Sequence, residues 1–205
     1  MTLAKRLSLR DALLGRRSFR LFAPDPVPAE LVREILEAAR WAPSPHHTQP
    51  WRFVVVTDPA WKRRLAEEMG HRWELDLRAD RTLDDEIVGR VGRSHLRILG
   101  APALVVCCIS MRDMHVYPDA VRQRAEHLMA SQSLGAAIQN VLLAAHDRGL
   151  ATGWICAPLF CPEIACAALE LPSDWEPQAV VLVGYPPRDV PLPPRAKPEL
   201  LVEFR

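Results

Sequence analysis

Two short runs of hydrogen-bond donors carry most of the chemistry in this sequence. Residues 16–20 read Arg-Arg-Ser-Phe-Arg and follow a predicted helix over residues 8–14. Residues 43–51 read Pro-Ser-Pro-His-His-Thr-Gln-Pro-Trp, between a second predicted helix and an apolar strand at 52–57. Guanidinium groups bind phosphate oxygens two at a time, and neutral imidazole, hydroxyl and carboxamide groups bind the polar edge of a ring. Together the runs predict two walls of a pocket for a phosphorylated, flat-ringed ligand.

The first run has a simpler alternative, in which its arginines balance the dipole of the helix that ends there. Glycine-rich phosphate loops are disfavoured, because neither G-x-G-x-x-G after a strand nor G-x-x-x-x-G-K-[ST] occurs and the chain has nine glycines in all. A bound phosphate would therefore be held by side chains. The donors available for this role are Arg16, Arg17, Ser18 and Arg20.

No metal site and no catalytic nucleophile are predicted. His46 and His47 are adjacent, which suits two ligands of one metal poorly, and neither an H-x-x-x-H pattern nor a nearby carboxylate supports them. They are interpreted as neutral donors and stacking rings, with the Gln49 carboxamide suited to a ring edge. The five cysteines form no C-x-x-C pair and are odd in number, as expected of reduced thiols in a cytoplasmic protein.

Composition favours one globular domain spanning residues 1–205. The chain of 205 residues is 49% apolar, which is enough for a substantial core. A net charge of +1 argues against broad binding to nucleic acid or to an acidic membrane surface. No signal peptide or transmembrane span is expected.

The chain alternates predicted helices and strands. A charged helical stretch at 60–98, less regular at Gly89 and Gly92, contains Arg72, Arg78 and Arg81. A long helix at 119–148 has an apolar second half, which indicates burial in the core or in a subunit interface. Residues 186–205 are rich in proline and predict a stiff, extended arm that lies over a surface. Further strands are expected at 103–109, 151–156 and 178–183, and a helix at 162–171.

The motifs resemble the nitroreductase family of FMN enzymes over nearly the whole chain. The resemblance is carried by residues 16–20, the proline-initiated helix, residues 42–51, and Gly184-Tyr185 before the arm. It implies an α+β fold: a three-layer α/β/α sandwich with a mixed, mostly antiparallel sheet, flanking helices and a C-terminal arm, in an intertwined homodimer. Further motifs are similar to one subgroup, the C-terminal reductase domain of the bifunctional enzyme of coenzyme F-420 biosynthesis: His46-His47-Thr48, Tyr117-Pro118-Asp119-Ala120, Phe160-Cys161-Pro162 and Leu171-Pro172-Ser173-Asp174-Trp175.

The resemblance also implies roles for individual residues. FMN would lie at the subunit interface, between the arginine run of one subunit and residues 44–46 of the other. The implied FMN-binding residues are Arg16, Arg17, Ser18, Arg20, Ser44, Pro45, His46, Gln49, Cys156, Ala157 and Arg195. The expected substrate-binding residues are His47, Arg72, Arg78 and Tyr117, although Arg72 and Arg78 could equally belong to a solvated helix face.

The implied activity is the reduction of the C=C bond of dehydro coenzyme F-420-0, with hydride carried by FMN and supplied by NAD(P)H or another reductant. This sequence has no counterpart of the subgroup's glutamyl ligase half, so the protein would work beside a separate ligase as a functional partner, or have a different substrate. Two alternatives stay open: a broad NAD(P)H-dependent nitro or quinone reductase, and a non-catalytic module that binds flavin or deazaflavin.

Overall fold

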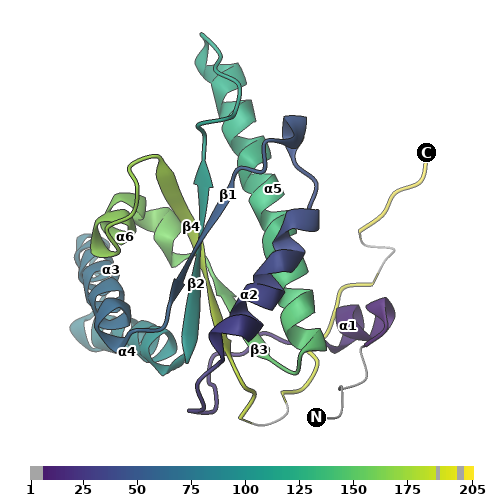
Figure 1. Ribbon diagram of the computed structural model, residues 1–205. Coiled ribbons are helices and arrows are strands. Elements are labelled where there is room, and N and C mark those ends of the chain that lie inside the picture. Colours follow the sequence, from purple (N-terminus) through teal and green to yellow (C-terminus); the bar gives the residue numbers. More distant parts are fainter. Residues whose placement is uncertain (1–6, 188–189, 198–200) are drawn as a thin grey trace.

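Four strands form the centre of the molecule (Figure 1). The structure, a computed structural model, describes residues 7–187, 190–197 and 201–205. The strands are β1 (Trp51–Val56), β2 (Ala103–Ser110), β3 (Ala151–Ile155) and β4 (Trp175–Gly184), in the order β1-β2-β4-β3 with every neighbouring pair antiparallel. The sheet is therefore wholly antiparallel and not mixed as expected, and the one parallel contact is an isolated bridge between Ser18 and Thr152 outside the named strands.

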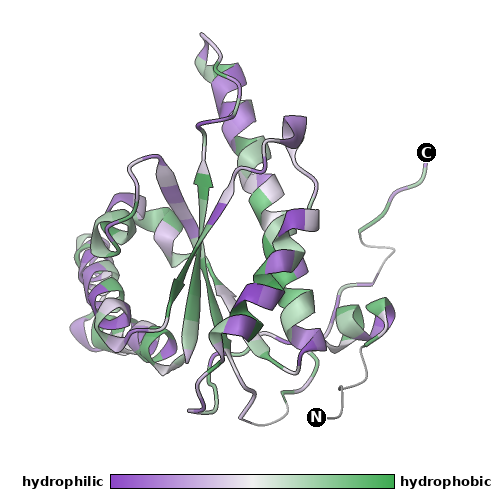
Figure 2. Cartoon of the chain, in the orientation of Figure 1, coloured by the Kyte–Doolittle hydropathy of each residue, from purple (hydrophilic) through white to green (hydrophobic). Residues whose placement is uncertain are grey.

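Successive side chains along each strand point to opposite faces of the sheet, so the protein has two cores, one on each face. Val105 and Cys107 of β2 point into a core with α2 (Ala29–Glu37) and α5 (Ala120–Asp147). Leu104 and Val106 point into the other core, with α3 (Pro59–Ala79), α4 (Asp84–Gly100) and α6 (Pro162–Ala168). Figure 2 shows apolar strands between helices whose outer faces are polar. The expected three-layer α+β sandwich is confirmed.

Short elements connect these layers. They are α1 (Leu9–Gly15) and three 3₁₀ turns: η1 (Ala38–Trp41), η2 (Pro45–His47) and η3 (Ala157–Phe160). The hydroxyl of Ser8 accepts a hydrogen bond from the backbone N–H of Asp11 at 3.1 Å and caps α1, as the sequence predicts.

The long helix α5 packs one side against the sheet. Its length of 28 residues and a mean hydropathy of 1.2 in its most apolar 18-residue window would suit a membrane span, but 44% of that window is buried inside the protein. A core helix of a folded domain has the same properties. The outward side, which includes Gly135, Ala136 and Gln139, stays only partly covered within one chain.

The segment 60–98 differs from the prediction. It forms two helices, and the break lies at residues 80–83, whereas Gly89 and Gly92 lie inside α4. Arg81 adopts a φ of 59° and closes α3, with the N–H of Thr82 donating to the carbonyl of Leu77 at 3.0 Å. An arginine in the left-handed region at a helix end gives no glycine signal in the sequence, so the position of the break was missed.

The C-terminal arm has no helix or strand in its described parts. Val190, Pro191 and Leu192 lie against the ends of α1 and α5, after which the chain runs outward and away from the body of the protein (Figure 1). Residues 190–197 form neither helix nor strand, and only the first part of the arm lies over the surface of its own chain. Leu201 and Phe204 near the end are exposed.

The contact that fixes the N-terminal segment depends on Gly153. A Cβ atom at this position would lie 2.1 Å from the carbonyl oxygen of Phe19, a distance at which one backbone must move. We expect Gly153→Ala to lower the free energy of unfolding by about 1–3 kcal/mol, the usual cost of overpacking, in urea denaturation. Gly92→Ala is the control, because a Cβ there meets no atom within 4 Å and alanine is the better helix former. Equal stability of the two variants would contradict this close approach.

Candidate functional site

The arginine segment, residues 16–20, is attached to the edge of the sheet. The N–H of Phe19 donates to the carbonyl of Thr152 on β3 at 2.8 Å, and further along the N–H of Ala23 donates to the carbonyl of Tyr185 at 2.9 Å. Ser18 forms the parallel bridge to Thr152 and is exposed. A segment that has no regular secondary structure of its own is thereby held in a fixed position beside β3.

Arg17 has a structural role. Its guanidinium donates to the carbonyl of Leu14 at 3.0 Å and also to the carbonyl of Gly15, which are unpaired groups at the end of α1. For Arg17, therefore, the simpler alternative of an arginine at the helix end describes the structure.

The other arginines of the group have no acidic partner. Among the residues that the structure describes, no carboxylate lies within ion-pair distance of Arg16, Arg20 or Arg195. Burial lowers the pKa of Arg16, and the positive charges of Arg195 and Arg17 lower it further. Arg195 on the arm is therefore close enough to Arg16 for their charges to interact. Like charges gathered without a counterion favour the binding of an anion.

His146, near the end of α5, lies beside Gly15, the residue that directly precedes the arginine segment. A Cβ at Gly15 would lie 2.6 Å from the His146 Nε2 atom, so the ring occupies the space that the missing side chain leaves. Burial lowers the pKa of His146, the charges of Arg17 and Arg16 lower it further, and Asp147 opposes the shift. The place of His146 beside α1 could not be predicted from the sequence, because nothing along the chain connects the two.

A cleft of about 500 Å³ opens next to the segment. Arg17, Phe19 and His146 line it together with the arm residues Val190 and Leu192. Arg16, Arg20 and Arg195 do not line this cleft, so it accounts for only part of the arginine group.

The second segment, residues 43–51, forms a braced loop with unusual backbone geometry. His46, His47 and Gln49 have φ values of 53°, 55° and 48°. The left-handed region costs non-glycine residues about 1–2 kcal/mol each, so the surroundings must hold these conformations. The Ser44 hydroxyl accepts from the N–H of Gln49 at 3.2 Å, and the Thr48 hydroxyl donates to the carbonyl of Pro45 at 3.0 Å.

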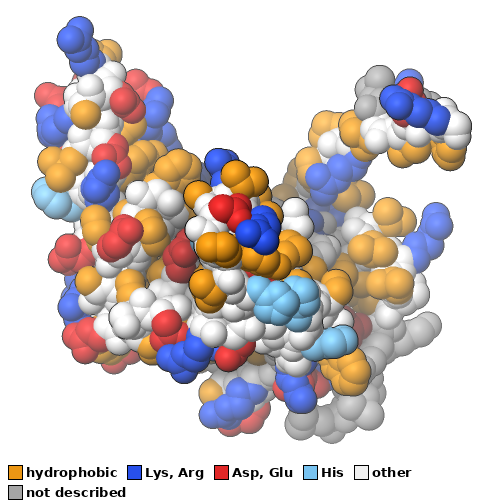
Figure 3. All heavy atoms as spheres, turned by 90° about the horizontal axis from the view of Figure 1, so that it is seen from above, with side chains coloured by type: hydrophobic (Ala, Val, Ile, Leu, Met, Phe, Trp, Pro, Cys, Tyr) orange, Lys and Arg blue, Asp and Glu red, His pale blue; other side chains and the backbone are white. Residues whose placement is uncertain are grey.

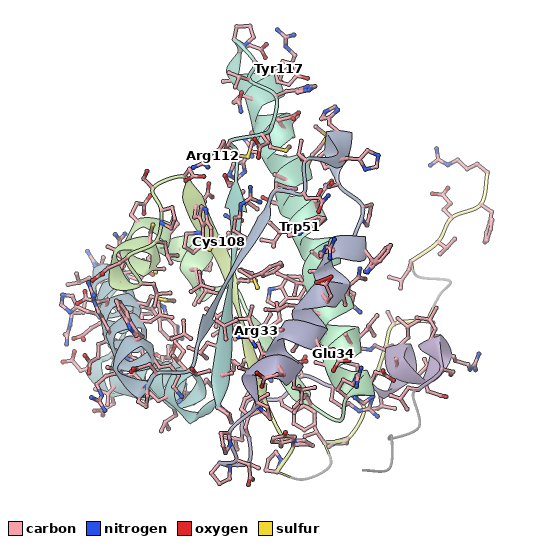
Figure 4. All side chains as sticks on the ribbon, in the orientation of Figure 1. Arg33, Glu34, Trp51, Cys108, Arg112 and Tyr117 are labelled. Carbon is pink, nitrogen blue, oxygen red and sulfur yellow. The ribbon has the colours of Figure 1, made fainter. Side chains whose placement is uncertain are left out.

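The ring of His46 turns toward a loop that follows β2. It stacks on His115 with ring centroids 4.0 Å apart, and its Nε2 lies 3.8 Å from a carboxylate oxygen of buried Glu126 on α5. The edge of Tyr117 contacts His115 at a centroid distance of 6.2 Å. Two predicted residues, His46 and Tyr117, are therefore brought together at the end of the molecule where Figure 4 labels Tyr117. His115 and Glu126 were missed, because their relation to His46 exists only in the folded chain.

The two predicted walls lie at opposite ends of α5. The histidine end contacts Glu126 and the arginine end contacts His146. Twenty residues of helix separate them, which at a rise of about 1.5 Å per residue is roughly 30 Å. Within one chain the two segments do not form a common pocket.

The other predicted residues are distributed over two places. Cys156, exposed, and Ala157, packed against the second core, lie where β3 leads into η3. Arg72 pairs with Asp76 at 3.0 Å, and Arg78 pairs with Glu74 and Asp84 at 2.9 and 2.7 Å. Both arginines belong to α3, on the opposite face of the sheet from α5, and an anion would have to compete with these carboxylates. Their surroundings resemble a solvated helix face.

The buried cysteines lack the properties of nucleophiles. Burial raises the pKa of Cys108 to about 12 and that of Cys107 well above its usual value. Figure 4 shows Cys108 within the sheet. Their thiols stay protonated at neutral pH and pack as small apolar groups.

Comparisons with known proteins point to one family. The model of the nitroreductase family matches residues 13–185. The chain is 37% identical to an NADH dehydrogenase of Thermus thermophilus, covering 88% of this chain and 87% of that protein, and 31% identical to the 5,6-dimethylbenzimidazole synthase of Rhodospirillum rubrum, covering 89% and 84%. A nitroreductase-type protein of Desulfovibrio desulfuricans, crystallised in complex with FMN, superposes with a TM-score of 0.74 at 27% identity, covering 98% of this chain and 99% of that one.

His146 should make stability depend on pH. Since its pKa is lowered in the folded protein from the ordinary value of 6.5, the unfolded chain takes up this proton at higher pH. The folded state therefore loses stability as the pH falls below about 6.5. We expect the free energy of unfolding to decrease less between pH 7 and pH 5 in His146→Gln than in the wild type, measured by urea denaturation. His71→Gln, which removes an exposed histidine on α3, is the control; an unchanged slope in His146→Gln would contradict the shift.

Proposed function

The chain belongs to the nitroreductase family, and we propose that it is an FMN-dependent oxidoreductase active as a homodimer. One observation carries the proposal: the cluster of Arg16 with Arg195 and Arg17, next to which the sequence places Ser18 and Arg20, has no carboxylate partner among the described residues. A phosphate monoester supplies the negative charge that this cluster lacks, and its oxygens match guanidinium and hydroxyl donors. The donor set therefore fits the phosphate of FMN.

The roughly 30 Å between the two walls favours a site shared by two subunits. A second copy in antiparallel orientation would bring residues 44–49 of one chain toward the arginine segment of the other. The partly covered side of α5, with Gly135, Ala136 and Gln139, offers small side chains for close helix contact. The exposed apolar residues Leu201 and Phe204 on the outward-running arm would pack on the partner.

In this arrangement Ser44, Pro45 and His46 would line the flavin of the other subunit, with Gln49 at the ring edge. Because the His46 ring is turned toward Glu126, its contribution would come from the backbone. Cys156 and Ala157 would face the ring through backbone groups at the end of β3. When bound, FMN would supply hydride transfer through N5 of its ring.

For the substrate we propose dehydro coenzyme F-420-0, whose C=C bond gains one hydride and one proton to give coenzyme F-420-0. Two of the subgroup motifs that suggested this substrate, His46-His47-Thr48 and the loop with Tyr117, lie 70 residues apart in the sequence yet meet at one end of the molecule. His47 and Tyr117 would contact the substrate there. Arg72 and Arg78 stay weaker candidates because of their ion pairs. A separate glutamyl ligase acting on the product, and a cytoplasmic location, belong to the same proposal.

A second candidate is a broad NAD(P)H-dependent nitro or quinone reductase. The similarity to the NADH dehydrogenase of Thermus thermophilus, at 37% identity over most of both chains, favours it. The two candidates share the flavin site and differ only in the substrate.

The phosphate assignment can be tested by substitution. We expect Arg16→Ala with Arg20→Ala to give a folded, colourless protein whose Kd for FMN rises at least about 100-fold, since hydrogen bonds to charged groups contribute about 1.5–3 kcal/mol each. Flavin absorbance after gel filtration and a fluorescence titration measure this. Arg33→Ala with Arg90→Ala removes two arginines that are paired with Glu30 and Glu86, and should keep full occupancy. Full flavin occupancy in the first variant would refute the assignment.

The substrate is tested by direct conversion. Purified protein with FMN and a reductant should convert dehydro coenzyme F-420-0 into a product that is heavier by two hydrogens, measured by mass spectrometry. His47→Ala should lower kcat/KM for this substrate while flavin stays bound. Rapid turnover of nitroaromatics with NAD(P)H and no conversion of the deazaflavin would favour the second candidate. Bound flavin that no reductant bleaches would indicate a non-catalytic binding module.

A further inference from the structure

Three side chains from separate segments meet at the histidine end of α5. His46 belongs to η2, His115 to the loop between β2 and α5, and Glu126 to α5 itself. Each offers one ligand atom, and these atoms lie within 4.8 Å of one another. Both histidines are exposed and Glu126 is fully buried, so the group is open to solvent on one side. Figure 3 shows exposed histidine side chains grouped on the face seen from above.

The carboxylate of Glu126 is incompletely satisfied. Its side chain is 0% exposed, and Oε1 accepts one hydrogen bond, from the backbone N–H of His115 at 3.0 Å. Oε2 is buried and has no hydrogen-bond partner among the residues that the structure describes. A buried carboxylate needs a cation or a full set of donors to offset the loss of hydration. This second observation points to a missing positive charge.

No lysine or arginine of the described chain supplies that charge. Arg122, four residues before Glu126 on α5, lies over the ring of Tyr117 at 5.1 Å and pairs with Asp119. The remaining basic groups are the rings of His46 and His115, and the Nε2 atom of His46 lies 3.8 Å from Oε1, beyond hydrogen-bonding distance.

The backbone fixes two of the three ligands. His46 is held at φ 53° and ψ 17° in the loop braced by Thr48, whose hydroxyl also contacts the sulfur of Met114 at 3.1 Å. Met114 is buried and directly precedes His115. The two imidazoles therefore lie beside the carboxylate on segments that contact each other, with their rings stacked at a centroid distance of 4.0 Å.

We propose that His46, His115 and Glu126 form a binding site for a single zinc ion. Two imidazoles and one carboxylate are a ligand set that zinc accepts, with bonds of about 2.0–2.2 Å and a fourth position left for water. In a tetrahedral site with these bond lengths, two ligand atoms lie about 3.4 Å apart, so the widest spacing of the group, which is up to 4.8 Å, has to close by as much as about 1.4 Å. The stacked rings of His46 and His115 also have to turn so that each points one nitrogen at the ion. The exposed side of the histidines supplies the open fourth position. Bound zinc would tie η2 to the loop before α5, and this inference does not rest on the proposed function.

The experiment uses the full-length protein with the flavin it retains, freed of metals by a chelator and dialysis. Isothermal titration with Zn²⁺ alone should give one ion per chain, and Zn²⁺ should raise the Tm, because a ligand that binds only the folded state stabilises it. Glu126→Gln and His115→Gln should each weaken binding at least tenfold and abolish the rise in Tm. His71→Gln removes an exposed histidine outside the group and should bind like the wild type.

Cobalt gives a second, spectroscopic readout that reports on the ligands of the bound ion. Co²⁺ in a site with two histidines and a carboxylate should show visible absorption bands, which His115→Gln should lose even if Glu126→Gln fails to fold. Flavin content is recorded in parallel, so that loss of cofactor is separable from loss of metal. Absence of Zn²⁺ binding in the wild type, or binding that His115→Gln leaves unchanged, would refute the zinc site and leave only a histidine–glutamate contact.

Discussion

The backbone pairing between Phe19 and Thr152 is the contact on which the candidate site depends. It holds a segment without regular structure against β3, and with it Ser18 and the neighbouring arginines. The pairing requires glycine at 153, because any side chain there would meet the Phe19 carbonyl. One small residue on an edge strand thus allows several positive charges to be held beside one another, at an electrostatic cost that a bound anion offsets.

The helix α5 sets the second constraint, because each of its ends contacts one of the two donor-rich segments and its length keeps those segments apart. One end contacts His46 through Glu126 and the other carries His146 under the arginine segment. Because the helix is rigid and long, a ligand that needs both segments has to bind between two chains. A half-buried outward side of α5 and an apolar arm end fit such an assembly. Catalytic activity would then require formation of the dimer.

Much of the fold could be predicted because its signals are local. Apolar runs predicted all four strands, and the helices predicted at 8–14 and 119–148 begin at Ser8 and Asp119, whose side chains accept hydrogen bonds from backbone N–H groups of the first turn. The break at Arg81 was missed because its cause is the geometry of a closing turn with no glycine in it. In the site, Arg17 proved to cap α1, and Arg72 and Arg78 proved to be paired. Side-chain partners of this kind depend on local geometry that residue type does not specify.

The sequence by itself determined which chemistry is available: an arginine-rich run, a histidine-rich loop, no glycine-rich phosphate loop, and elements that form a three-layer α+β domain. Tertiary structure decided how these groups are combined. It brought His146 under the arginines, joined His115 and Glu126 to His46, and placed the two predicted walls about 30 Å apart. The reason is physical: propensity and hydrophobic period act over a few residues, whereas charge pairing and burial depend on which surfaces meet after folding.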